Sequence, residues 1–234
     1  MAITRIGNPA IADVREPNFR NIIINGDMSI AQRGTSATGI GNGDSGYHTC
    51  DRWRFQETGS PTAVFTQTQS TDVPTGQGFA KSLKMDCTTA DASLDADIFM
   101  RLDHRFEGQM LQYLKKGTSY AESITVSFWV KSNKTGTYIC EFEDIDNGRT
   151  INKSYTINTA NTWEKKTITY AGDTTGTLDN DNERSLNFSF YLGVGTTYTS
   201  GTLATSWESR TNANRAVGQV NLADSTSNEW YVTG

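Results

Sequence analysis

The 234-residue sequence lacks the features of a disulfide scaffold, a nucleic-acid-binding protein or a membrane protein. Cys50, Cys87 and Cys140 are widely spaced and odd in number, which predicts buried free thiols and no zinc site. The net charge is −5 and no basic run occurs, so a nucleic-acid partner is not expected. No stretch approaches the ~20 apolar residues of a membrane span, and residues 1–20 lack the apolar core of a signal peptide. We therefore expect neither membrane insertion nor export by a cleaved signal.

Catalytic motifs are also missing. His48 and His104 are the only histidines, and neither has a metal-ligand spacing. A serine nucleophile elbow, a phosphate-binding loop and a dinucleotide fingerprint are all absent. The acidic loop at 179–183 lacks the glycine and the distal glutamate of an EF-hand loop, so no motif supports a structural calcium ion. These absences predict a protein that is not an enzyme and that needs no cofactor.

Carboxylates are numerous enough that a glycosidase pair has to be considered. Asp97 and Asp103 lie on one expected strand, and Glu141 and Glu143 on another. We interpret both pairs as solvated charges on strand faces.

Short alternating segments separated by polar loops fill the sequence from residue 21 onward. Such spacing, without strand–helix–strand alternation, predicts an all-β fold: an antiparallel jelly-roll β-sandwich. Asp146-Asn147-Gly148 predicts a tight hairpin turn, residues 107–116 one short helix, and the glycine-rich stretch 39–43 a loop. Strands are expected at 21–24, 47–56, 63–69, 79–87, 97–106, 123–132, 138–144, 149–158, 163–170, 186–192 and 229–233. The expected inward face includes Ile124, Val126, Phe128, Val130, Phe188 and Phe190.

Outward-facing aromatic residues are the candidates for ligand binding. Sugars present flat C–H faces edged by hydroxyls, which aromatic rings and polar side chains bind. Trp129 and Tyr191 are expected on the non-core faces of two strands, with Arg101 and Asp103 on that of a third. If these faces coincide, the four side chains form a glycan-binding platform; alternatively, the protein or another subunit covers Trp129. Trp207, in the long polar segment before the last strand, is a further candidate for contact with a ligand or subunit.

Residues 1–20 form a separate unit with no sustained hydrophobic period. They are either a disordered lead-in or an extended N-terminal arm that docks onto a partner. The arm's anchors would be Ile3, Ile6, Ile11 and Phe19. The chain is thus divided into an arm at 1–20 and a sandwich at 21–234.

The segments at 21–36, 46–55, 107–138 and 161–177, taken together, resemble a domain of bacteriophage virion proteins. Within them, N-G-D at 25–27, S-F-W-V-K at 127–131 and the W-x-x-x-x-x-T of 163–169 are similar to the pattern of family 4/9-type carbohydrate-binding modules. The resemblance covers residue 21 to the end and implies a jelly roll. The family pattern continues into V-Q-L-E-x-G, so we expect the last strand of this chain to be cut short. No calcium ligand or sugar contact is carried over by the matching motifs.

The resemblance implies a non-enzymatic virion structural protein, a tail fibre or capsid-surface decoration, whose jelly roll binds host-surface polysaccharide. Expected partners are other virion proteins, bound through residues 1–20, and further copies of the chain in a homotrimer. The alternative is a purely structural adaptor or decoration subunit that binds no glycan.

Overall fold

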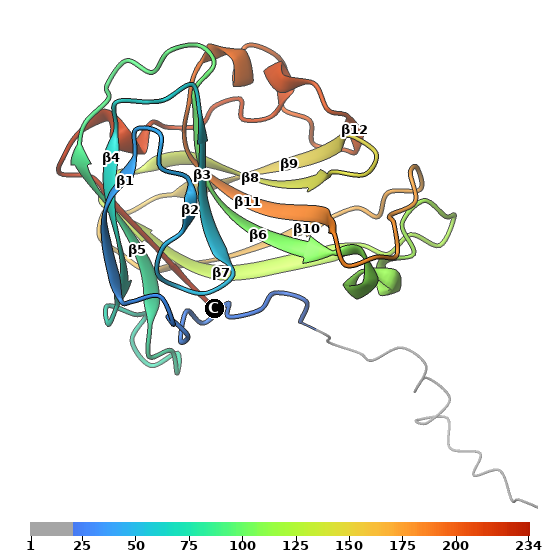
Figure 1. Ribbon diagram of the computed structural model, residues 1–234, viewed down its shortest axis with the longest axis horizontal. Coiled ribbons are helices and arrows are strands. Elements are labelled where there is room, and N and C mark those ends of the chain that lie inside the picture. The colour runs from blue at the N-terminus through green and yellow to red at the C-terminus, as the bar shows by residue number, and fades with distance from the viewer. Residues whose placement is uncertain (1–20) are drawn as a thin grey trace, which may run out of the picture.

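The computed structural model describes residues 21–234, so Ile3, Ile6, Ile11 and Phe19 lie outside the described residues. Two antiparallel sheets pack face to face, one of six strands in the order β1-β4-β5-β13-β7-β10 and one of seven in the order β12-β9-β8-β11-β6-β3-β2 (Figure 1). The chain passes repeatedly between the two sheets, which confirms the all-β jelly-roll prediction. The strands are β1 Ser36–Gly41, β2 Gly46–Tyr47, β3 Trp53–Thr58, β4 Val64–Ser70, β5 Ser82–Thr89, β6 Phe99–Glu107, β7 Ile124–Ser132, β8 Gly136–Asp144, β9 Arg149–Ile157, β10 Glu164–Tyr170, β11 Arg184–Val194, β12 Glu208–Ser209 and β13 Glu229–Thr233.

Aromatic rings fill the space between the sheets, and Phe190 on β11 lies at their centre. Its ring centroid is 4.9 Å from that of Phe128, 5.5 Å from that of Trp230 and 5.9 Å from that of Trp53. Phe190 is 1% exposed, and the other residues expected to face inward belong to or pack against the same core cluster. The alternation along β7 and β11 therefore predicted the core correctly.

The helix expected at 107–116 is wrong. The segment forms two short 3-10 turns, η1 at Gly108–Met110 and η2 at Gln112–Leu114. Gly108 explains why: a Cβ there would lie 1.7 Å from the carbonyl oxygen of Asp179, so the chain is pressed against the loop before β11. The backbone N–H of Gln109 donates to Asp181 in the same loop. Tertiary contacts thus override the helical spacing of the apolar residues.

The N-terminal part of the sandwich differs most from the sequence prediction. Residues 21–24 form no strand, although Asn25 turns as expected with φ 58°. The glycine-rich stretch is not wholly a loop, because β1 extends to Gly41 with a register shift before Ile40. The expected strand 47–56 is interrupted by a turn in which Arg52 adopts φ 72°, and β3 begins only at Trp53. In contrast, the hairpin turn between β8 and β9 is confirmed, with Asp144 opposite Arg149.

A third layer covers the outer face of the seven-stranded sheet. Every residue of β11 from Ser185 to Gly193 is buried, so both faces of this strand are covered. The segment between β11 and β13 supplies the cover, and a second small cluster joins Phe99, Tyr191, Tyr198 and Ala216. In Figure 1 this orange-to-red segment runs past the ends of β8 and β9. The long polar segment of the sequence is therefore a packed layer.

The structure confirms the prediction for the cysteines, since all three are free and buried. No helix among the described residues is long and apolar enough to cross a membrane.

Truncation of the central ring tests this account of the core. Phe190→Ala should reduce the free energy of unfolding by about 3–5 kcal/mol, because it removes a buried ring and leaves a cavity among three others. Urea-induced unfolding followed by tryptophan fluorescence measures the change. The control, Ser154→Ala at an exposed position of β9, should change stability by less than about 0.5 kcal/mol. Equal effects of the two substitutions would contradict the assignment of Phe190 to the core.

Candidate functional site

The outer face of the seven-stranded sheet carries rows of polar residues that run across neighbouring strands. Asp103 of β6 is paired with Ser189 of β11, which is paired with Glu141 of β8. Opposite residues on adjacent strands point to the same face of a sheet, so each row brings side chains from three strands together. A parallel row joins Arg105, Asn187 and Glu143, and a third joins Gln56, Arg101 and Tyr191.

A buried ion network crosses these rows. Glu141 is fully buried and accepts a bidentate pair of hydrogen bonds from Arg215, with Nε–Oε1 and Nη2–Oε2 distances of 2.7 Å. Arg101 Nη1 donates to the same carboxylate at 2.9 Å, and the Tyr191 hydroxyl donates at 3.0 Å. Buried charges persist only when they are paired in this way. The interpretation of Glu141 and Glu143 as solvated strand charges is therefore wrong, since the third layer covers both of them.

Glu143 forms the second centre of the network. Its carboxylate lies 3.1 Å from Arg101 Nη2, 2.8 Å from Arg210 Nη1 and 3.2 Å from Arg215 Nη2. Burial alone would raise the pKa of Glu143, but the charges of the three arginines overcome burial and lower the pKa to about 2. Burial alone would lower the pKa of Arg101, but Asp103, followed by Tyr191, Glu143 and Glu141, outweighs burial and raises it.

A pocket of about 390 Å³ opens over this network, and we call it the arginine groove. It is lined by Gln56, Phe99, Arg101, Glu143, Ile145, Arg184, Arg210 and Arg215. Several buried polar atoms along the same rows have no hydrogen-bond partner in the described chain, including both amide atoms of Asn187, Nη1 of Arg54 and Nε of Arg105. Leaving such atoms unpaired costs about 1–3 kcal/mol each. These residues do not line the groove, although Asn187 is paired in the sheet with Glu143, which does.

The predicted platform residues do not come together. Arg101, Asp103 and Tyr191 share the outer face of the seven-stranded sheet, as expected, but they are at most 3% exposed. Trp129 is partly buried on β7 of the six-stranded sheet, where it pairs with Lys165 and Thr233. The outward face of that sheet is opposite to the outward face of the other. The four residues are thus split between the two sides of the sandwich and do not form one platform.

Trp207 is neither exposed nor isolated. Its indole Nε1 donates to the carbonyl oxygen of Ala171 at 2.8 Å, and Lys116 Nζ lies 5.2 Å from the centroid of its ring. Lys116 is itself buried and bridges Asp144 and Asp173. The Trp207 side chain therefore packs within the described chain at the end of the sandwich.

The sequence prediction also missed several residues of the groove. Arg184 lies at the start of β11, and Arg210 and Arg215 lie in the covering layer, where no periodicity marks them. The spacing of Arg101, Asp103 and Arg105 against Glu141 and Glu143 was a usable signal. These residues lie on β6 and β8, which flank β11, so alternation of opposite charges on the two strands indicates ion pairs across the strand between them.

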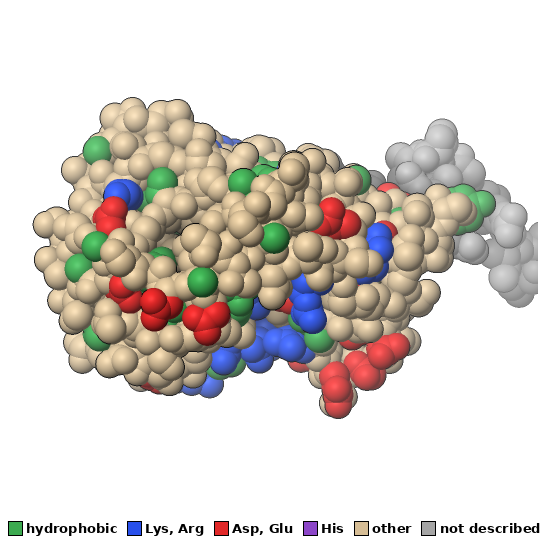
Figure 2. Space-filling view, turned by 90° about the horizontal axis from the view of Figure 1, so that it is seen from above, with side chains coloured by type: hydrophobic (Ala, Val, Ile, Leu, Met, Phe, Trp, Pro, Cys, Tyr) green, Lys and Arg blue, Asp and Glu red, His purple; other side chains and the backbone are tan. Residues whose placement is uncertain are grey.

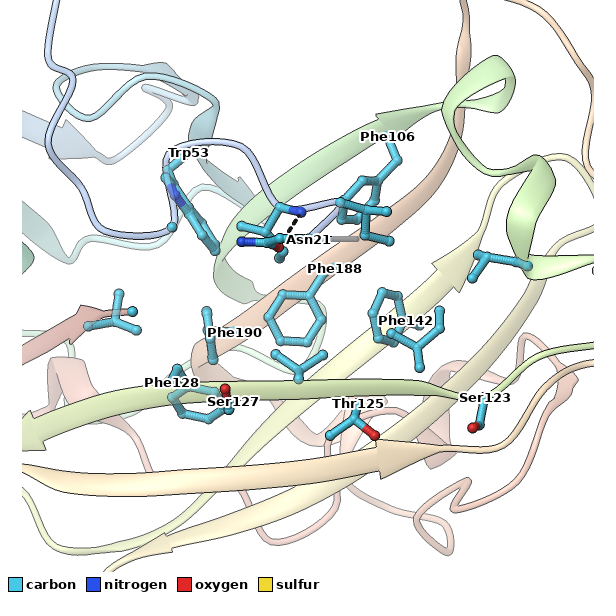
Figure 3. A pocket seen from close by; sticks show the side chains of 18 of the residues that line it. Asn21, Trp53, Phe106, Ser123, Thr125, Ser127, Phe128, Phe142, Phe188 and Phe190 are labelled. Carbon is cyan, nitrogen blue, oxygen red and sulfur yellow. Dashed lines mark hydrogen bonds between the residues drawn. The ribbon is translucent and has the colours of Figure 1, made fainter. Parts of the chain in front are cut away.

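A second, larger cavity of about 680 Å³ lies between the sheets. Phe142, Phe188 and Phe190 point into it from β8 and β11 (Figure 3). It borders residues 124–128 of β7, which pair with β10 on one side, whereas β13 pairs only with residues 129–132. No strand among residues 21–234 pairs with 124–128 on that second side. The cavity has an apolar floor and polar groups at its rim, which suits an apolar occupant better than a sugar.

Metal binding finds no support in the part of the chain that the structure describes. Within it, no group of three or more His, Cys, Asp or Glu side chains is placed to hold a metal ion.

No protein-family model and no curated protein sequence matches this chain. Solved structures with some likeness include a protein of Bacteroides thetaiotaomicron described as sugar binding, at 11% identity and a TM-score of 0.45, over 92% of this chain and 97% of that one. A xylan-binding CBM22-2 domain from Paenibacillus barcinonensis Xyn10C has 14% identity and a TM-score of 0.39, over 78% and 88%.

The enzymatically active domain of tailspike protein 4 from bacteriophage CBA120 has 17% identity and a TM-score of 0.38. The match covers 68% of this chain but only 20% of the tailspike chain. Likeness at these levels says nothing about what this chain binds.

Acidification tests the ion network. The folded pKa of Glu143 lies below its ordinary value of 4.5, so the network's contribution is present above about pH 4.5 and is lost as the pH falls toward 2. The loss should be on the order of 3 kcal/mol. Glu143→Gln should flatten the fall in unfolding free energy across this window, as measured by urea unfolding at a series of pH values.

A control variant and the pKa of His104 allow the pH dependence to be assigned to Glu143. Glu122→Gln, at a side chain that is 50% exposed, should retain the wild-type pH dependence. Burial lowers the pKa of His104 to about 4, so its destabilising protonation falls between about pH 6.5 and 4, above most of the Glu143 window. A wild-type slope between pH 4.5 and 2 in Glu143→Gln would contradict the network's role.

Proposed function

We propose that this chain is a non-enzymatic glycan-binding jelly roll whose binding site is the arginine groove. The carrying observation is the charged and polar lining of this pocket, in which Arg101, Arg184, Arg210 and Arg215 lie beside Gln56 and Glu143. Guanidinium groups donate and carboxylates accept hydrogen bonds, so a ligand rich in hydroxyls could pair with several lining groups at once. Gln56, which is only partly buried, offers both a donor and an acceptor, the combination that a sugar hydroxyl requires.

The ion network gives the groove a fixed floor. Arg101 and Glu143 are held in place by partners on both sides, so a ligand meets prearranged groups and little side-chain entropy is lost on binding. We place no general acid or base in the groove, because Glu143 remains ionised above a pKa of about 2 and is shared among arginines. The proposal is therefore that the protein binds glycans without cleaving them.

The setting we propose is a phage virion, as a tail fibre or capsid-surface decoration, in a homotrimer that attaches through residues 1–20. The supporting observation is the resemblance of the segments at 21–36, 46–55, 107–138 and 161–177 to a virion domain. A purely structural adaptor remains the second candidate, and it predicts that the intact protein binds no glycan.

A substitution in the groove lining separates binding from folding. Gln56→Leu removes a partly buried side chain that accepts one hydrogen bond, from Arg101 at 3.3 Å, so it should lower the free energy of unfolding by no more than about 1.5–3 kcal/mol. The same change should weaken glycan binding at least about tenfold, because a hydrogen-bonding side chain is lost from the groove. Binding is measured on a glycan array and by affinity electrophoresis, and stability by urea unfolding.

Trp129→Ala probes the opposite face in the same assays. Loss of binding in Trp129→Ala with none in Gln56→Leu would move the site to the outer face of the six-stranded sheet. Absence of binding by the wild-type protein to every glycan would leave the structural adaptor. Release of reducing sugar from a bound polysaccharide would refute the non-enzymatic part of the proposal.

Deletion of residues 1–20 tests the attachment arm. The shortened protein should fold and bind glycan as before, but it should be absent from purified particles when it replaces the full chain during phage assembly. Quantitative immunoblotting of the particles measures incorporation, and Ile3→Asp/Ile6→Asp in the full-length chain provides a milder variant. Normal incorporation of the deleted protein would refute attachment through this segment.

A further inference from the structure

The groove contains more positive charge than its own carboxylates neutralise. Three arginines of the network, Arg101, Arg210 and Arg215, are matched by three carboxylates, Asp103, Glu141 and Glu143. These pairs account for every carboxylate in the network. The remaining positive charges beside it belong to Arg54, Arg105 and Arg184.

These three arginines have little neutralisation from the described chain. Arg54 lies no closer than 3.9 Å to Asp103, a carboxylate that Arg101 already engages at 3.0 Å. Arg105 and Arg184 have no ion pair with any described carboxylate within 4.0 Å. Glu107 is opposite Arg184 in the sheet register, but its carboxylate instead accepts a hydrogen bond from Gln109.

The arginines also repel one another. Burial and the adjacent positive charge of Arg105 lower the pKa of both Arg54 and Arg184. Like charges held together in a partly buried site destabilise the folded protein unless an anion joins them. This concentration of positive charge occurs in a chain whose net charge is −5. Blue Lys and Arg side chains can be seen gathered between separate groups of red Asp and Glu side chains in Figure 2.

The groove has no aromatic surface on which a neutral sugar ring could stack. Phe99, its one aromatic lining residue, is 6% exposed, and the guanidinium of Arg101 covers its ring at 4.8 Å from the centroid. Tyr191 beneath is fully buried. Without stacking, affinity has to come from hydrogen bonds, and those between arginine and a carboxylate are about twice as strong as neutral ones. The guanidinium fork also matches a carboxylate geometrically.

We propose that the arginine groove selects anionic polysaccharides, with sugar carboxylates bound by Arg184 in the groove and by the partly exposed Arg54 and Arg105 beside it, and hydroxyls bound by Gln56. This inference rests on the proposed function and specifies its substrate class. It concerns the sign of the ligand's charge and not the identity of its sugars.

The test compares acidic polysaccharides with their own neutral derivatives. Affinity electrophoresis measures binding of the full-length chain to polygalacturonate, alginate and hyaluronate, each before and after chemical reduction of its carboxylates to alcohols. We expect at least one acidic form to bind at least about tenfold more tightly than its reduced counterpart. Raising the ionic strength from about 0.05 M to about 0.5 M should weaken that binding, because screening shortens the reach of the charges.

Charge-removing variants locate the interaction. Arg184→Gln and Arg105→Gln should each reduce binding of the acidic polymer about tenfold. Lys165→Gln removes the same charge from an exposed position of β10 on the opposite sheet and should leave binding unchanged. Urea unfolding of each variant provides the folding control. Since both arginines are repelled by like charges, we expect their replacement not to lower stability.

The outcomes separate this inference from the proposed function. Equal binding of acidic and reduced polymers, or binding of neutral glycans alone, would overturn the anionic preference and leave glycan binding intact. Binding of no polysaccharide in either form would overturn both. Comparable affinity for single-stranded DNA would overturn selectivity for polysaccharides, because the groove would then bind any polyanion. Charge-dependent binding that neither Arg184→Gln nor Arg105→Gln alters would place the anion outside the groove.

Discussion

The bidentate ion pair between Arg215 and Glu141 holds the third layer of the molecule against the sandwich. Glu141 lies near the C-terminal end of β8, and Arg215 lies 74 residues later in the chain. Taking a carboxylate out of water costs several kcal/mol unless its partners are well placed. If the covering segment separated from the sheet, the carboxylate of Glu141 would lose its bidentate partner. Two walls of the arginine groove, Arg210 and Arg215, depend on this pair for their position.

This arrangement reconciles a polar composition with a deeply buried sheet. Hydrophobic residues make up only 35% of the chain, yet β11 is covered on both sides. Its inner face packs apolar rings such as Phe188 and Phe190, whereas its outer face packs Asn187, Ser189 and Tyr191 beneath paired charges. Ion pairs and hydrogen bonds thus hold the third layer against the outer face, whereas apolar contacts hold the two sheets together on the inner face. Because they are directional, they also fix where each arginine points.

The sequence predicted the sandwich more fully than the site. Alternation in β7 and β11 identified the inward residues, since a buried face imposes a period of two. The same alternation placed Arg101, Asp103 and Tyr191 on one outward face, but periodicity carries no information about what covers that face. Gly108 illustrates the limit of local patterns, because its contact with Asp179 arises from a loop about 70 residues away and replaces the expected helix. Likewise, Trp129 and Tyr191 could be separated only once the strand order was known.

The two cavities present contrasting physical problems, and only one points to a glycan. The aromatic rings that line the cavity beside β7 lack dispersion contacts on the cavity side, and an apolar occupant would supply them. At the arginine groove, by contrast, the like charges of Arg54, Arg105 and Arg184 are left uncompensated beside the ion network. If the groove were merely structural, a carboxylate or an apolar side chain at Arg105 would lower the energy of the folded chain. Uncompensated charges that cost stability are expected where binding, and not folding, determines the residue.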